Sequence, residues 1–384
     1  MPSAMVMLSA RGGGDRPPVI ALALGLRERG WDVHVLCDRE SANLIEETGL
    51  RMTIFPEAMD QRGSLRGWSQ AVRATDPPQA KGIANPLDLW AEALADMAEA
   101  ECRAANADVI ISALFTMGLA RQVSEATGIG WILINPSFSF GDNLDREWAE
   151  DWHPPVIPLF AEYVLLPLAR EANFVLHATD AEMDFLAEPI AENEDHVGFL
   201  LWEPTRAIPE NILGAAEPWR LITTSTEAQR DEIQLVRAAV DALSEREGTT
   251  ILTLANRELQ AELGNLPANA LVAGFVPHSP IIQKSELVIS HAGHGIVSKC
   301  LVHGTPMLLL PWDRDQPGVA ARATRLRTSL AIGREQVNTE RVRDAVRRIL
   351  EEPGFGKQAE VHAKRLQSVD GVQKAVDLVE ARLG

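Results

Sequence analysis

Short runs of apolar residues recur along the chain, and segments with helical spacing separate most of them. The runs that predict strands lie at 4–9, 31–37, 51–55, 108–114, 131–135, 219–225, 250–255, 271–276, 286–290, 307–311 and 329–332. Continuous apolar runs of this length are typical of strands buried on both faces of a parallel sheet. Strands that alternate with helices in this way predict an α/β fold.

The clearest strand–helix–strand unit lies within 274–316. The strand 286–290 leads into HAGHG at 291–295, and a helix is expected to open near Ile296. Gly304 is expected to end this helix, and the strand 307–311 follows. The first turn of the unit therefore directs a helix N-terminus beyond the end of a buried strand.

This turn suits a negatively charged ligand. Glycines allow a ligand to approach the backbone, and the free N–H groups and dipole at a helix N-terminus favour an anion such as a phosphate. Glycines in buried turns also serve packing alone. The turn by itself therefore leaves phosphate binding and simple packing equally open.

A second glycine-rich turn, at 10–18, follows the first predicted strand. A helix over about 17–29 comes next, with Gly30 as its stop. Glycines 12–14 are consecutive, so the dinucleotide fingerprint GxGxxG is not in register. Asp15 stands just before the helix, where an aspartate is a common N-cap.

Composition and charge narrow the functional classes. The 384 residues suggest two domains, and a net charge of −18 argues against nucleic acid or an anionic membrane as partner. Cys37, Cys102 and Cys300 stand far apart, which fits a reducing compartment without structural zinc. No apolar run reaches the length of a membrane span, and no basic segment precedes the first apolar run. We therefore expect a cytoplasmic protein.

The 274–316 block carries a family resemblance. The FVP segment at 275–277, HAGHG at 291–295, a strand ending in Pro311 and the Asp315-Gln316 pair resemble the donor-site signature of family 1 nucleotide-sugar glycosyltransferases. Bacterial natural-product glycosyltransferases of the glycopeptide, macrolide and enediyne type, and sterol glycosyltransferases, are the nearest class. The resemblance implies the GT-B fold, in which two Rossmann-like βαβ domains face each other across a cleft.

The same resemblance implies a domain plan. Residues 1–204 would bind the acceptor and end in a strand over 197–204, residues 205–218 would link the domains, and 219–365 would bind the nucleotide-sugar donor. The last stretch, 366–384, would be a helix that crosses back to the N-terminal domain.

Donor-site roles follow from the resemblance, position by position. Ile296 stands where the family usually has a threonine that binds phosphate, which shifts the diphosphate contacts toward His291 and backbone N–H groups. The implied donor residues are Phe275 and Val276 for the nucleobase; His291, Gly293, Gly295, Ile296, Ser225 and Thr226 for the diphosphate; and Asp315 and Gln316 for the sugar.

The N-terminal turn resembles the G-D-x-x-P variant of the family's first motif, which makes Asp15 the implied catalytic base. The capping role and the base role remain compatible. Aromatic residues in later segments are candidates to line an apolar acceptor pocket, namely Trp68, Phe138 and Phe140. A long helix over 86–105 is expected to pack in the core of the same domain.

The function implied is inverting, metal-independent transfer of a sugar from a dTDP- or UDP-sugar to a lipophilic small molecule such as a polyketide. No cofactor and no metal are expected. The expected partners are a nucleotide-sugar donor and a hydrophobic acceptor, with no nucleic acid and no stable membrane insertion, and a homodimer is left open. Two alternatives remain: a nucleotide-sugar epimerase of GT-B shape, and a non-catalytic glycosyltransferase-like partner protein.

Overall fold

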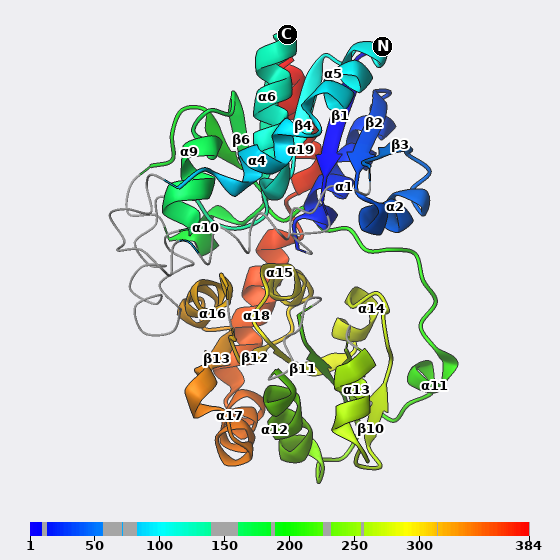
Figure 1. The fold of residues 1–384 in the computed structure, drawn as a ribbon. Coiled ribbons are helices and arrows are strands. Elements are labelled where there is room, and N and C mark those ends of the chain that lie inside the picture. The colour runs from blue at the N-terminus through cyan, green and yellow to red at the C-terminus, as the bar shows by residue number, and fades with distance from the viewer. Residues whose placement is uncertain are drawn as a thin grey trace. The chain divides into compact units, whose positions relative to one another are not determined.

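The computed structural model describes residues 1–9, 14–56, 71, 83–139, 160–185, 189–225, 232–254, 257–312 and 314–383. These residues form two compact units. The first contains the described residues up to Trp202 together with those from Asp370 onward, and the second contains Glu203–Val369. Each unit is a parallel sheet covered by helices, and each is described separately (Figure 1).

The sheet of the first unit is parallel throughout, in the order β3-β2-β1-β4-β5-β6-β7. Its strands are β1 Ser3–Leu8, β2 Asp32–Cys37, β3 Arg51–Ile54, β4 Val109–Ser112, β5 Trp131–Asn135, β6 Phe174–His177 and β7 Glu194–His196. The strand order reverses direction between β1 and β4. At such a switch point the strand ends of an open α/β sheet leave a crevice that ligands occupy.

The helices of this unit include two from distant parts of the sequence that pack together. Gly25 of α1 lies so close to α19 that an added β-carbon would approach Val372 Cγ1 to 2.5 Å. The described helices of the unit are α1 Arg16–Glu28, α2 Arg39–Glu46, α4 Pro86–Glu92, α5 Ala95–Ala104, η2 Leu114–Thr116, α6 Met117–Thr127, η3 Ala161–Leu165, α9 Leu166–Ala169, α10 Ala181–Asp184 and α19 Gly371–Leu383.

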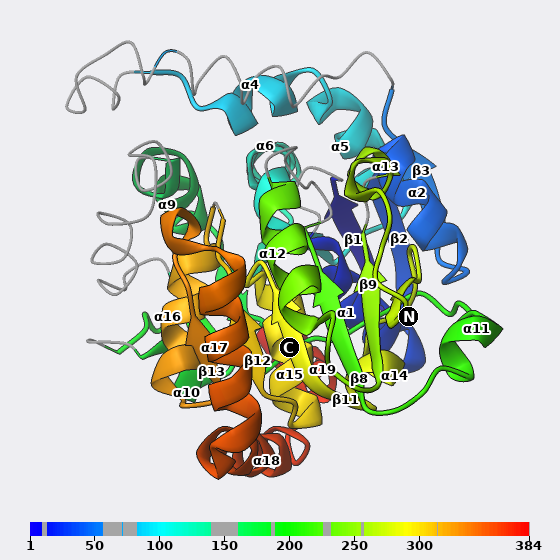
Figure 2. The ribbon, with the colours of Figure 1, turned by 90° about the horizontal axis from the view of Figure 1, so that it is seen from below.

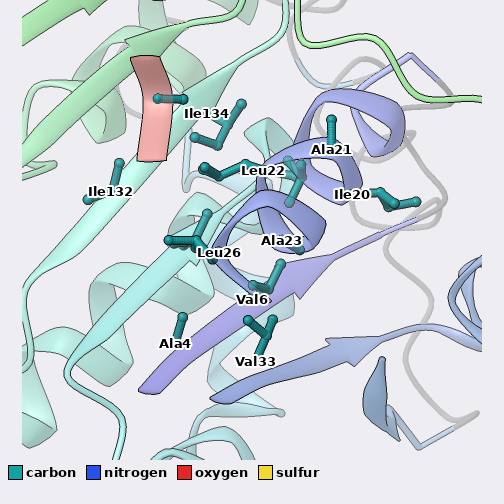
Figure 3. Close-up of a cluster of buried hydrophobic side chains, with 14 of the residues drawn as sticks. Ala4, Val6, Ile20, Ala21, Leu22, Ala23, Leu26, Val33, Ile132 and Ile134 are labelled. Atoms are coloured by element: carbon teal, nitrogen blue, oxygen red, sulfur yellow. The ribbon is translucent and has the colours of Figure 1, made fainter. Parts of the chain in front are cut away.

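Leu22 and Leu26 of α1 lie in the buried cluster that joins this helix to the sheet. Figure 3 shows them with Val6 of β1 and Ile134 of β5. The strand residues alternate between two clusters, so that Val6 faces α1 while Met5 belongs to the cluster with α4 and α6. Burial on both faces explains why the strands are apolar without a polar alternation.

The sheet of the second unit has six parallel strands in the order β10-β9-β8-β11-β12-β13. In chain order within the unit this is 3-2-1-4-5-6, the arrangement of doubly wound nucleotide-binding sheets, with the switch point between β8 and β11. The strands are β8 Trp219–Thr223, β9 Thr249–Thr253, β10 Ala270–Val272, β11 Ser285–Ser290, β12 Met307–Leu309 and β13 Ser329–Ala331.

Helices α12 and α17 lie side by side in this unit (Figure 2) and pack in one cluster with Ile222, Leu252 and Leu308 of the sheet. Helix α15 packs against α18 and α14. The described helices of the unit are α11 Glu210–Leu213, α12 Ile233–Leu243, α13 Arg257–Leu263, α14 Ser279–Ile282, α15 His294–His303, α16 Gln316–Arg325, η5 Arg334–Gln336, α17 Thr339–Glu351 and α18 Pro353–Leu366.

Several elements differ from the sequence-based expectation. The helix expected over 86–105 is two helices, α4 and α5, which meet at Ala93 and Leu94. The strand expected over 271–276 ends at Val272, and the segment 197–204 that was expected to be a strand has no strand structure. Strand β6 was not predicted. The helix expected to open near Ile296 begins two residues earlier, at His294. It ends before Gly304, as expected, and Gly304 has a left-handed φ of 73°.

Candidate functional site

The candidate site of the second unit is built on the carboxyl ends of β8 and β11. These strands are neighbours, and Thr223 at the end of β8 pairs in register with Ser290 at the end of β11. The residues that follow each strand, Thr224-Ser225 and His291, therefore emerge at the same edge of the sheet. This edge is the switch point of the sheet.

The turn after β11 is short. Ala292 adopts a left-handed φ of 63°, and its N–H donates to Ser290 Oγ at 3.2 Å. Gly293 is the N-cap of α15 with φ −65° and ψ 142°, values open to any residue. A β-carbon there would nevertheless overlap the His291 imidazole, lying 3.2 Å from Cε1 and closer still to Nε2. Glycine at 293 therefore makes room for the ring.

His291 is a buried and neutral imidazole. Only 9% of the residue is exposed, and burial, followed by the charge of Arg314, lowers its pKa from 6.5 to about 3, although the Thr223 backbone acts in the opposite direction. Nδ1 is buried and has no hydrogen-bond partner among the described residues. A buried polar atom without a partner is costly, so it marks a place where a ligand can supply the missing bond.

The end of β8 adds two hydroxyl groups to this edge. Thr224 is buried, and its Oγ1 finds no hydrogen-bond partner within the part of the chain that the structure describes. Ser225 is also buried, and its Oγ accepts a hydrogen bond of 2.8 Å from Arg314 Nη2. Thr226, the third residue expected near the diphosphate, lies outside the described residues.

The first turn of α15 offers backbone N–H groups and the imidazole of His294, whose Nδ1 lies 3.4 Å from Ser298 Oγ. A β-carbon at Gly295 would meet no described atom within 4 Å, so packing does not require glycine there. Ile296 is buried and directs no polar group outward. The positive end of the α15 dipole and its unsatisfied N–H groups thus remain the features of this turn that attract an anion.

The loop 274–279 holds the residues expected at the nucleobase. Phe275 is 52% exposed and carries the Arg206 guanidinium over its ring at 4.7 Å, whereas Val276 is buried. Glu203 fixes the next turn, since its carboxylate accepts the N–H groups of His278 at 2.7 Å and Ser279 at 3.0 Å.

An ion pair stabilises that anchor. Burial alone would raise the pKa of Glu203, but Lys299, at 2.8 Å, and the hydrogen bonds lower it to about 2. Glu203 is therefore charged at neutral pH, and it ties the segment after Trp202 to α15 through Lys299.

The two residues expected at the sugar differ in exposure. Asp315 is exposed, at the N-cap of α16. Gln316 is only 2% exposed, and its Oε1 accepts the N–H of Trp312 at 2.8 Å. This bond closes the loop between β12 and α16, so Gln316 has a structural role that the sequence did not reveal.

In the first unit, Asp15 follows β1 as the N-cap residue of α1. It is 8% exposed, and its carboxylate makes no capping hydrogen bond. The reason lies in the sequence: N2 and N3, the positions whose N–H groups a capping side chain would bind, are Pro17 and Pro18, which have none. The capping interpretation of the Asp15 side chain is therefore wrong.

Only one of the expected acceptor residues can be described. Phe138 is 4% exposed, and its carbonyl accepts a hydrogen bond from the Asn135 side chain at 2.7 Å. Trp68 and Phe140 lie outside the described residues, so an acceptor role for all three stays a prediction.

Sequence reasoning missed two features. One is Arg314, whose backbone is left-handed with φ 62° and whose side chain reaches Ser225. The other is a network on β5, β6 and β7, in which His177 contacts Asn135 and Glu194, while His196 contacts Asp184. Neither set has a local motif, although the charged residue next to Asp315-Gln316 was a usable signal for Arg314.

Comparison with known proteins supports the resemblance. Residues 237–372 match the family model for the C-terminal domain of erythromycin biosynthesis protein CIII-like proteins. The 4'-demethylrebeccamycin synthase of Lentzea aerocolonigenes is 25% identical over 426 residues, which cover 99% of each chain. The oleandomycin glycosyltransferase of Streptomyces antibioticus is 28% identical over 133 residues, 35% of this chain and 31% of that protein.

Solved structures give the same fold. The glycosyltransferase of kitacinnamycin superimposes with a TM-score of 0.77 at 19% identity, covering 100% of this chain and 99% of the other. The spinosyn rhamnosyltransferase SpnG, solved with thymidine diphosphate, gives 0.71 at 18% identity over 99% of this chain and 100% of that one.

These findings confirm the resemblance to natural-product glycosyltransferases, the GT-B fold and the assignment of the chain as a glycosyltransferase. Within the described residues, no helix is both long and apolar enough to cross a membrane. Among those same residues, no three histidine, cysteine, aspartate or glutamate side chains gather in a way that could hold a metal ion.

Proposed function

We propose that this glycosyltransferase moves a sugar from a dTDP- or UDP-sugar to a lipophilic natural-product acceptor, with inversion at the anomeric carbon and without a metal ion. The observation that carries the proposal is His291: a buried, neutral imidazole with an unsatisfied Nδ1, beside the N-terminus of α15 at a sheet switch point. Relatives named for rebeccamycin and oleandomycin, and a neighbour solved with thymidine diphosphate, support the donor and acceptor classes.

The leaving group needs stabilisation that His291 and α15 are suited to give. When the bond between the anomeric carbon and the diphosphate breaks, negative charge grows on the diphosphate oxygens. A neutral imidazole N–H and the N–H groups of the first turn of α15 donate hydrogen bonds to this charge without prior reorganisation. These donors are the groups that would stabilise the leaving diphosphate in the absence of a metal ion.

Asp15 is proposed as the general base. It takes the proton from the acceptor hydroxyl as the oxygen attacks the anomeric carbon from the face opposite the diphosphate, which inverts the configuration. Only 8% of the residue is exposed, so its carboxylate is largely shielded from water.

The test is transfer itself. The chain is incubated with UDP-glucose or dTDP-glucose and a panel of aromatic polyketide, indolocarbazole and macrolide aglycones, with and without EDTA, and products are detected by mass spectrometry. The proposal predicts a β-glucoside from the α-linked donor, in equal yield with EDTA. An α-glucoside contradicts inversion, a loss of yield with EDTA contradicts metal independence, and an epimerised donor without glycoside favours the epimerase alternative.

A further inference from the structure

The segment between β12 and α16 carries an arginine directed toward the candidate diphosphate site. Arg314 is half-buried, and its Nη2 donates to Ser225 Oγ at 2.8 Å. Ser225 lies two residues beyond the end of β8. Strand β8 pairs with β11, and His291 is the residue that directly follows β11. Arg314 therefore joins the loop after β12 to the switch point of the sheet.

Arg314 also acts on His291 electrostatically, since its charge is the second cause of the lowered pKa of that imidazole. The side chains placed at this edge supply no positive charge: His291 is neutral, Thr224 and Ser225 offer hydroxyls, Ile296 is apolar, and Asp315, next to Arg314 in the chain, is acidic. The chain as a whole carries −18 and so repels a nucleotide at long range. A cation at this position supplies what the other groups lack.

We propose that Arg314 is a diphosphate-binding residue, whose guanidinium donates to the phosphoryl oxygens of the donor while Ser225 holds it in position. This inference rests on the proposed function and adds a residue to its site. Guanidinium groups bind phosphate oxygens through two parallel N–H donors, which gives both charge and geometry. At position 314 this would offset the lack of a hydroxyl at Ile296 and balance the charge that develops on the leaving diphosphate.

The backbone conformation at Arg314 supports a role of this residue in binding and not only in folding. Arg314 has a φ of 62°, a conformation that disfavours every residue except glycine and, to a lesser degree, asparagine and aspartate. Glycine at 314 would thus relax the backbone while removing the guanidinium. If Arg314 served stability alone, this replacement would lower the melting temperature, whereas a binding role leaves it unchanged or raised.

The chain provides a matched control. Arg327, just after α16, is also a left-handed arginine, with φ 60°, and it is exposed. Arg314→Gly and Arg327→Gly each remove one positive charge and relieve one left-handed side chain. Any difference in nucleotide binding between them therefore reports the position of the charge and not its amount.

The experiment is isothermal titration of the full-length chain with dTDP, UDP, dTMP and UMP, for the wild type, Arg314→Gly, Arg314→Lys, Arg327→Gly and His291→Ala. We expect Arg314→Gly to lose at least about tenfold in diphosphate affinity and much less in monophosphate affinity. Arg314→Lys should recover part of the loss, and Arg327→Gly should bind as the wild type does.

The outcomes separate the two claims. If the wild type binds a diphosphate and His291→Ala loses it while Arg314→Gly binds normally, the role of Arg314 is refuted and the proposed donor site stands. If the wild type binds none of the four nucleotides, both claims fail. Equal losses in Arg314→Gly and Arg327→Gly also refute the inference, because total charge would then explain the effect.

Discussion

The imidazole of His291 occupies the space that a side chain at Gly293 would need. The glycine is thus coupled to the histidine through packing, since its φ and ψ are open to other residues. Gly295, two residues on, has no such neighbour among the described atoms. Packing against His291 therefore requires glycine at 293 but not at 295, and substitutions at the two positions should have different effects.

Gly293→Ala should displace the His291 ring and weaken donor binding. Overpacking of this kind costs about 1–3 kcal/mol of stability, so the melting temperature should fall together with the affinity for dTDP or UDP. Thermal unfolding and titration on the same preparations measure both effects.

Gly295→Ala should separate these two effects. Alanine within a helix is more stable than glycine by about 0.5–1 kcal/mol, and no described atom obstructs the new methyl group. We expect equal or higher stability with weaker diphosphate binding, because a methyl group on this turn would keep a phosphate from approaching the backbone N–H groups closely. Undiminished affinity for the diphosphate would show that the ligand does not approach this turn.

Asp15→Asn tests the base. Because the carboxylate makes no capping hydrogen bond to α1, the substitution removes only its interaction with the helix dipole, about 0.3–1 kcal/mol of stability. We expect kcat to fall by about 10²–10⁴-fold, the usual contribution of a general base, with donor affinity unchanged. Steady-state kinetics with one accepted aglycone measure kcat, and titration with dTDP or UDP measures the affinity. A variant that keeps its kcat would remove Asp15 from the mechanism.

Two buried histidines make a large contribution to the pH dependence of stability. Burial, as the main cause, lowers the pKa of His291 to about 3 and that of His278 to about 4, whereas an unfolded histidine titrates near 6.5. Below about pH 6.5 the unfolded chain binds protons that the folded chain does not. The contribution of each histidine to the free energy of unfolding should therefore be fully present above this pH. It should fall on acidification by up to about 1.4 kcal/mol per pH unit.

His291→Asn isolates one of these contributions. The variant should lose stability less steeply than the wild type between pH 6 and 4, whatever its stability at pH 7. Urea unfolding at several pH values gives the two slopes. Equal slopes would mean that His291 is protonated in the folded protein.

The packing of α19 on α1 gives a prediction for the first unit. Gly25→Val should force the two helices apart at Val372 and Val376, and overpacking suggests a loss of about 1–3 kcal/mol. Gly354→Ala, in the first turn of α18, is the control, since a β-carbon there meets no described atom within 4 Å. If denaturant unfolding showed the same change for both variants, close packing at Gly25 would not be the cause.

The sequence predicted the parts of the fold that local chemistry determines. Apolar runs located the strands around the switch points, and Gly304 located the end of α15. The break between α4 and α5 was not predictable from periodicity, because Leu94 and the residues around it continue the helical pattern.

The site was predicted where a motif exists and missed where residues meet only in space. His291 and Gly293 adjoin in sequence, so their turn was recognisable. Arg314 and Ser225 are 89 positions apart, and only the sheet brings them together. The prediction that the Asp15 side chain caps α1 was wrong, although the sequence itself shows Pro17 and Pro18, which lack the N–H groups that a cap would bind.

The affinity of dTDP and UDP for the wild type and for His291→Ala, measured by titration at pH 7.5, tests the donor site directly. We expect at least one diphosphate to bind the wild type and to stabilise it, by about 2.7 kcal/mol at 100 times its dissociation constant. We also expect His291→Ala to lose most of this affinity while remaining folded. A wild type that binds neither nucleotide, or a variant that binds as tightly as the wild type, would contradict the assignment of the donor site.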